Sequence, residues 1–63
     1  MQESEFYFKF CEVMRRRGEV KSKNLAELFE VSRTTARKHL KNLMSKGKIK
    51  KKGSGRSTAY VFN

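Results

Sequence analysis

Residues 25–43 of the chain read LAELFEVSRTTARKHLKNL, and this stretch decides the fold. Apolar residues recur there at helical spacing in two groups, first Leu25, Leu28 and Phe29, then Ala36, Leu40 and Leu43. Between the groups, Val31 and Ser32 break the pattern, and Ser32 suits the N-cap of a second helix because its hydroxyl accepts a hydrogen bond from the first turn. The stretch therefore predicts two helices, at about residues 23–30 and 33–46, joined by a tight turn.

A third helix is predicted ahead of this pair. Its apolar positions are Phe6, Phe10, Val13 and Met14. Ser4 is the expected N-cap, and Gly18 is expected to end the helix in a left-handed conformation, after three arginines that suit the C-terminal end of the helix dipole. The helix should run from about residue 5 to 17. A short extended piece at residues 19–21 follows, with Ser22 as the cap of the next helix.

The spacing of the apolar residues changes after Gly47. Residues 49–52 and 58–62 read as strands around the glycine-rich segment 53–57, which predicts a hairpin over about residues 48–62 with a flexible basic tip. Sixty-three residues suffice for one small domain. The predicted fold is therefore a single α+β domain across the whole chain, with three helices and a C-terminal two-stranded β-hairpin.

The charges are divided unevenly between the two halves. All six acidic residues are glutamates within residues 1–30, where six of the 16 basic residues balance them. The other ten Lys and Arg lie in residues 31–63 with no acid, so that half carries the entire net charge of +10. A concentration of like charges destabilises a folded domain by self-repulsion unless a bound polyanion offsets it. This pattern points to nucleic acid.

The segment from Leu25 to Leu43 closely resembles the winged helix-turn-helix transcription regulators, and the resemblance continues over about residues 20–62. In that family a small residue such as Ala26 lets the helices approach, and a glycine and arginine hairpin forms the wing. The chain departs from the pattern at Glu30, where the family commonly has glycine. We expect Glu30 either to tolerate a left-handed conformation or to mark a variant turn. The resemblance implies sequence-specific binding of double-stranded DNA by a transcriptional regulator.

The candidate DNA contacts come from the predicted recognition helix, 33–46, and from the wing. They are Ser32, Arg33, Thr34, Thr35, Arg37, Lys38, Lys41, Asn42, Lys50, Lys51, Lys52, Ser54 and Arg56. Arg33 and Arg37 suit guanine and Asn42 suits adenine, because their side chains match the donors and acceptors of those bases in the major groove. Ser32 is placed for a phosphate at the helix N-terminus. Arg56, at the wing tip, suits a narrow minor groove with its negative potential.

The first helix has more apolar surface than one small core requires. We expect part of it to form a homodimer interface, made by Phe6, Tyr7, Phe8 and Cys11. A two-fold dimer reads two half-sites about one turn of DNA apart, which raises the specificity of a domain with few base-reading side chains. The alternatives are that this surface packs within the domain or against a longer partner protein.

Other classes of function fit less well. One His, one Cys and no Asp leave no convergent set for catalysis, and no Cys and His spacing fits zinc, so no enzyme, metal or cofactor is expected. The apolar runs are too short to cross a bilayer and the single cysteine forms no internal disulfide, so we expect an intracellular, cytoplasmic protein with no membrane partner. No small-molecule effector is evident. Three rival functions remain open, which are nonspecific architectural DNA binding, binding of RNA or left-handed duplex, and a winged helix for protein interaction.

Overall fold

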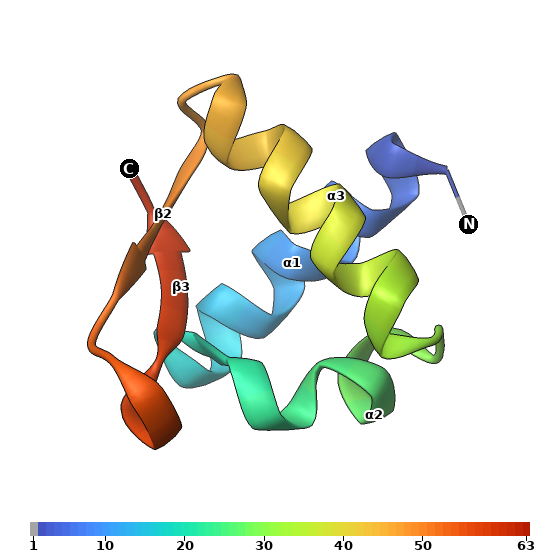
Figure 1. The fold of residues 1–63 in the computed structure, drawn as a ribbon. Helices are drawn as coiled ribbons and strands as arrows, with labels where there is room; N and C mark the ends of the chain where they lie inside the picture. The colour runs from blue at the N-terminus through green and yellow to red at the C-terminus, as the bar shows by residue number, and fades with distance from the viewer. Residues whose placement is uncertain (1) are drawn as a thin grey trace.

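The computed structural model describes residues 2–63 (Figure 1). In chain order its elements are α1 (Glu3–Arg17), β1 (Val20–Lys21), the 3-10 turn η1 (Ser22–Asn24), α2 (Leu25–Phe29), α3 (Arg33–Ser45), β2 (Ile49–Lys52), the 3-10 turn η2 (Gly55–Ser57) and β3 (Ala59–Phe62). The predicted α+β architecture is confirmed, because three helices pack beside an antiparallel sheet whose β2 and β3 form the wing (Figure 1).

The sheet has three strands, because the short extended piece predicted at residues 19–21 pairs with the predicted two-stranded hairpin as β1. Its order is β1-β3-β2, and both neighbours of β3 run antiparallel to it. In β1, Val20 pairs with Tyr60 and is fully buried. Burial of its side chain stabilises a strand that pairs through only two residues. The extra strand ties the segment that follows α1 directly to the wing.

The core is formed by all three helices and the sheet. It consists of Phe6, Phe10, Val20, Leu25, Phe29, Ala36, Leu40, Leu43, Ile49 and Tyr60. Phe6 stacks on Phe29 with ring centroids 4.2 Å apart and lies 5.1 Å from the His39 ring, so this one side chain joins α1 to α2 and α3. The placement of Phe6 in a dimer interface was therefore wrong, because its side chain is 0% exposed.

Two of the predicted helix starts were also wrong. α1 begins two residues early, at Glu3, with Gln2 as its N-cap and Ser4 inside the first turn. The predicted helix at residues 23–30 is a 3-10 turn followed by the five-residue α2, and the backbone N–H of Ser22 donates to the Thr58 carbonyl, 3.1 Å away, which ties η1 to the wing. Ala26 is exposed, so it does not provide the close helix contact that the resemblance implied.

The turn between α2 and α3 agrees with the sequence. Glu30 adopts the left-handed conformation, with φ 54° and ψ 36°, at the position where the resembling family has glycine. Glutamate accepts the strain of that conformation because the turn is fixed on both sides by buried residues, Phe29 and Ala36. Ser32 is the N-cap of α3, and its hydroxyl oxygen accepts from the Thr35 N–H at 3.2 Å. Gly18 ends α1 at φ 78°, as predicted.

The wing tip is a folded turn, where the sequence predicted a flexible loop. The Ser57 N–H donates to the Ser54 carbonyl at 3.0 Å, and the Thr58 hydroxyl donates to the Gly55 carbonyl at 2.9 Å. Gly53 is required here, since a Cβ on it would lie 2.5 Å from the Ser57 carbonyl oxygen. The tip therefore holds Arg56 on an ordered 3-10 turn.

Candidate nucleic-acid interface

The exposed surface of α3 has two flanks, one toward the wing and one toward α1. At about 100° per residue, Arg33, Arg37 and Lys41 fall on the flank beside β2 and β3. On the other flank, Asn42 and Lys46 face α1, which passes behind α3 in Figure 1. Thr34 and Lys38 lie between the flanks and are exposed.

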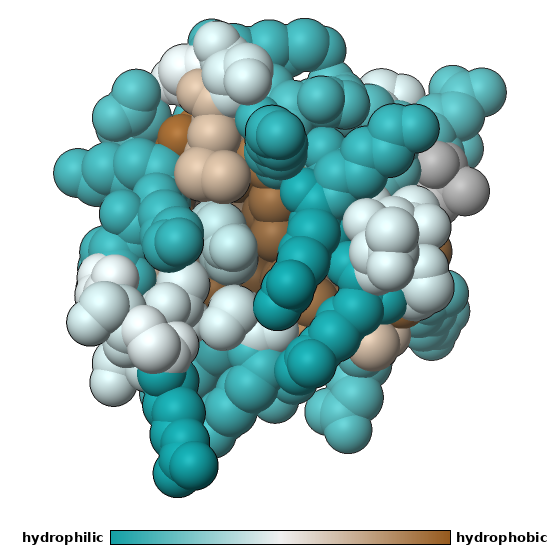
Figure 2. Space-filling view, viewed as in Figure 1, coloured by the Kyte–Doolittle hydropathy of each residue, from teal (hydrophilic) through white to brown (hydrophobic). Residues whose placement is uncertain are grey.

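A groove runs between the wing-facing flank of α3 and the wing. Its tip end, which we call the tip hollow, has a volume of about 490 Å³ and is lined by Ser22, Lys23, Arg33, Arg37, Gly55 and Arg56. Its other end, the wing hollow, has a volume of about 530 Å³ and is lined by Ser22, Arg37, Lys41, Met44, Lys51, Gly55, Thr58 and Tyr60. Ser22, Arg37 and Gly55 belong to both hollows. Figure 2 shows hydrophilic side chains around this face, with apolar surface visible at its centre between the strands and α3.

The cations of this groove have no carboxylate partner within residues 2–63. Arg33, Arg37 and Arg56 are exposed, and they come from two separate elements, the start of α3 and the wing tip. The ion pairs of the described chain all involve Glu3 or Glu19, neither of which lines the groove. The groove therefore concentrates positive charge in a concave surface.

The α1-facing flank is different, because its polar groups are occupied within the protein. Lys46 forms a hydrogen-bonded ion pair with Glu3. Hydrogen bonds from Lys46 and then from Asn42 lower the pKa of the Glu3 carboxyl below its usual value. Nearby, the Lys48 ammonium lies 4.8 Å from the centre of the Tyr7 ring. Asn42, predicted to read adenine, is thus directed toward α1 and lines neither hollow.

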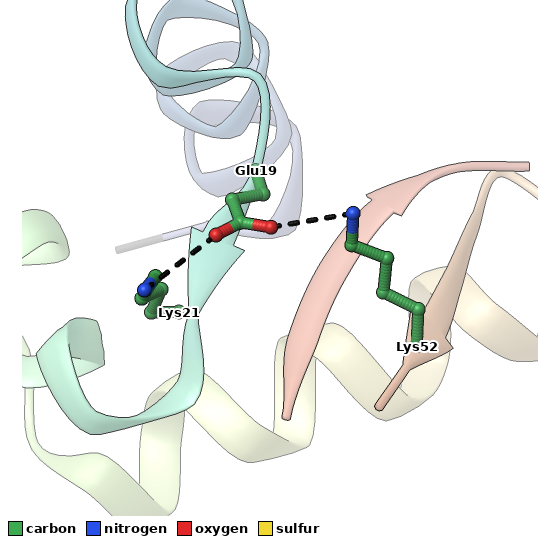
Figure 3. Close-up of polar contacts among 3 residues, drawn as sticks. All are labelled: Glu19, Lys21 and Lys52. Atoms are coloured by element: carbon green, nitrogen blue, oxygen red, sulfur yellow. Dashed lines mark ion pairs between the residues drawn. The ribbon is translucent and has the colours of Figure 1, made fainter. Parts of the chain in front are cut away.

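The three lysines of β2 do not share one surface. Successive side chains of a strand point to opposite faces, and Ile49 is buried against the helices, so Lys51 lies on the helix side of the sheet, where it lines the wing hollow. Lys50 and Lys52 lie on the outer face. There Glu19 bridges two strands, with its carboxylate 3.3 Å from the Lys52 ammonium and 3.8 Å from that of Lys21 (Figure 3).

Three further predicted contacts, Ser32, Thr35 and Ser54, lie at the start of α3 or in the wing. Ser32 and Thr35 bond to each other through their hydroxyls at 2.9 Å, and Thr35 is half-buried, so this pair serves the turn. Ser54 is exposed beside the wing tip. Two groove residues, Ser22 and Lys23, were missed because the sequence assigned them only to a helix start. Pairing of β1 with β3 brings them beside the wing, and no local sequence signal indicates that pairing.

The predicted dimer surface is reduced once Phe6 is assigned to the core. Phe8 is 64% exposed, Cys11 is half-buried, and Tyr7 is half-buried against Phe62 in an edge-to-face contact with ring centroids 6.5 Å apart. Loss of hydration raises the pKa of the Tyr7 hydroxyl. Phe62 itself remains 42% exposed. Aromatic surface thus remains on the outer side of α1 and the end of β3.

No helix among residues 2–63 has the length and apolar character needed to span a bilayer.

No curated protein matches the chain. Among solved structures, the chain is similar to the crystal structure of the apo-Zalpha domain of zebrafish PKZ, with a TM-score of 0.78 and 18% sequence identity over 95% of this chain and 94% of that one. This likeness confirms the winged-helix fold. A family model described as the C-terminal domain of DIP2311-like transcriptional regulators matches residues 11–63, most of the chain. The protein therefore belongs to the DIP2311-like family of transcriptional-regulator C-terminal domains, a winged helix-turn-helix family of the DNA-binding type.

Proposed function

We propose that the protein binds double-stranded DNA with sequence preference, inserting α3 into the major groove and laying the wing tip along the adjacent minor groove or backbone. The observation that carries this proposal is the groove between α3 and the wing, where cations from both elements converge without a carboxylate. Membership of a family of transcriptional-regulator domains supports a binding role over a catalytic one. Such a role places the protein inside the cell, in the compartment that holds the DNA.

The exposed surface of α3 provides the chemistry for base reading. The major groove admits an α-helix, and an arginine fork matches the two acceptors of guanine. Arg37 lies midway along the groove, so we assign it the base-reading role, with Thr34 and Lys38 beside it on the exposed face. Lys41 and Lys51 serve as phosphate contacts. If about six phosphates are neutralised, the logarithm of affinity falls against the logarithm of salt concentration with a slope near −5.

Selection of bound duplexes from a random pool at physiological salt tests this function. We expect an enriched sequence, and a palindrome if two copies bind together. Equal recovery of all duplexes would instead identify an architectural DNA-binding protein. Preference for RNA, or conversion of an alternating cytosine and guanine duplex to the left-handed form in circular dichroism, would identify the second rival. Absence of any duplex binding in dilute buffer would leave a protein-interaction module.

We propose further that two copies associate through the outer side of α1. The acids of its first turn, Glu3 and Glu5, and the three arginines of its last turn give this helix opposite charges at its two ends. An antiparallel pair of α1 helices would set Glu5 of one copy against the arginines of the other, around the exposed Phe8. A two-fold pair of this kind would present two groove surfaces to one duplex.

Light scattering after gel filtration tests the dimer. We expect a wild-type dimer at micromolar concentration and a monomer for Phe8→Glu, with Lys9→Glu as the control on the same helix. A monomeric wild type discards the dimer and leaves the DNA-binding proposal intact. Retention of the dimer by Phe8→Glu would show that another surface holds the copies together.

A further inference from the structure

The tip hollow draws its lining from three parts of the chain. Ser22 and Lys23 come from η1, Arg33 and Arg37 from the first two turns of α3, and Gly55 and Arg56 from the wing tip. Four of these six residues are cations, and none is an acid. The remaining two are a serine and a glycine, which leave room for a small polar group.

The four cations have no counter-ion in the described chain. Glu19 is bound to Lys21 and Lys52 on the outer face of the sheet, and Glu3 is bound to Lys46 beside α1. Like charges that converge in a hollow repel one another, and an anion placed among them relieves this repulsion. Arginine forks suit the oxygens of a phosphate in particular, because each guanidinium donates two parallel hydrogen bonds.

The hollow is also built to keep its shape. The Ser22 N–H donates to the Thr58 carbonyl, so η1 is fixed to the base of the wing. Hydrogen bonds within residues 54–58 order the tip that holds Arg56. Arg33 is the first residue of the 13-residue α3, so the positive end of that helix dipole lies at the same place. The backbone segments that carry the donors are thus held in place before any ligand binds.

We propose that the tip hollow binds one phosphate group of the DNA backbone, with Arg33, Arg56 and Lys23 as its charged contacts and the Ser22 hydroxyl as a further donor. This inference rests on the proposed DNA binding and gives that interface a defined anchor. The phosphate is held between the helix-turn-helix and the wing, so its position fixes the angle at which α3 enters the major groove. Lys23 and Ser22 become DNA contacts, and Arg33 contacts the backbone in place of guanine.

A matched pair of double variants tests the anchor in the complete chain. Lys23→Gln with Arg56→Gln removes two charges from the hollow, whereas Lys9→Gln with Lys50→Gln removes two from surfaces away from it. Fluorescence anisotropy across a salt series measures affinity for a selected and a random duplex. The hollow variant should lower the salt slope by about 0.9, the value for the loss of one phosphate contact, and weaken both duplexes by the same factor. Equal slopes for the two double variants would overturn the anchor while DNA binding by the wild type stands.

Inorganic phosphate tests the hollow without DNA. In NMR spectra of the wild type, the Nε–Hε signals of Arg33 and Arg56 should move on addition of phosphate and stay in place with chloride at equal ionic strength. The hollow variant should lose the response at Arg33. If the wild type binds no duplex but shows this response, the DNA-binding proposal fails and the phosphate site stands. If phosphate moves neither signal, the phosphate site is wrong.

Discussion

The two flanks of α3 carry similar side chains but differ in what surrounds them. On the wing-facing flank, Arg33, Arg37 and Lys41 line a groove to which no carboxylate of residues 2–63 contributes. On the α1-facing flank, Lys46 and Asn42 are engaged by Glu3. Whether a cation is available to an outside partner therefore depends on the carboxylates of neighbouring elements, and a helical wheel of α3 alone does not contain that information.

The largest effect is expected from removing the packing that holds α1 against α3. Phe6→Ala deletes a fully buried ring that stacks on Phe29 and contacts His39. We expect a loss of about 3–5 kcal/mol in the free energy of unfolding, enough to unfold much of so small a domain. Urea titration followed by circular dichroism measures it, with Phe8→Ala on the exposed side of α1 as the control. A fully stable Phe6→Ala protein would contradict the assignment of this ring to the core.

Arg37→Ala sharpens the comparison from the wing-facing side. If Arg37 reads guanine, the change should cost about 1–3 kcal/mol on the selected duplex and relax the preference at one position. Lys46→Ala, on the other flank, should leave binding nearly unchanged because Glu3 already occupies that lysine. Competition binding with single-base variants of the site measures both. Equal losses on selected and random duplex would show that Arg37 contacts only phosphate.

The same comparison extends to the two faces of β2. Lys51→Ala should lower the salt slope by about one and weaken all duplexes alike, because Lys51 lines the wing hollow. Lys50→Ala, one residue away on the outer face, should change the slope little. Anisotropy titrations at several salt concentrations distinguish them. If the two variants behave alike, the alternation of β2 does not govern contact with DNA.

The smallest effect concerns the ion pair that occupies the α1-facing flank. The pKa of Glu3 is lowered from 4.5 chiefly by its hydrogen bond with Lys46, so the folded state favours the charged carboxylate. Its contribution to stability is complete above the unfolded pKa and is lost as pH falls through the folded one. The melting temperature of the wild type should slightly exceed that of Glu3→Gln at neutral pH, and the difference should vanish in acid. A difference that grows in acid would reverse the assigned sign.

The sequence predicted most of the elements whose signals are local. The cap at Ser32 and the stop at Gly18 depend on residues within one turn of each other. At Glu30 the sequence left a left-handed residue and a variant turn both open, and the structure has the left-handed residue. The errors at Ser4 and Ser22 have a shared cause. A serine near a helix start is a good cap in isolation, but α1 begins earlier, at Glu3, and the tertiary bond to Thr58 places Ser22 in a 3-10 turn.

The candidate site was predicted only in part, because its limits are set by contacts between distant segments. Pairing of β1 with β3 brings Ser22 and Lys23 to the wing and places Glu19 beside Lys52. Charge counting treated Lys50, Lys51 and Lys52 as equivalent, yet the pleat of β2 separates them. Counting charges in the two halves of the sequence also does not reveal that the Glu3 carboxylate is hydrogen-bonded to Asn42 in the other half. Each of these facts requires the tertiary fold.

The strand order β1-β3-β2 leaves β2 at the edge of the sheet, with one row of backbone N–H and C=O groups unpaired in the sheet. An edge of this kind invites strands of other molecules to add to it, and lysines are a common protection against such aggregation. β2 carries three of them in succession, Lys50, Lys51 and Lys52. The three lysines, of which only Lys51 lines the groove, thus together keep concentrated protein in solution. Neutralising all three at once should produce precipitation before it yields a clean measurement of lost affinity.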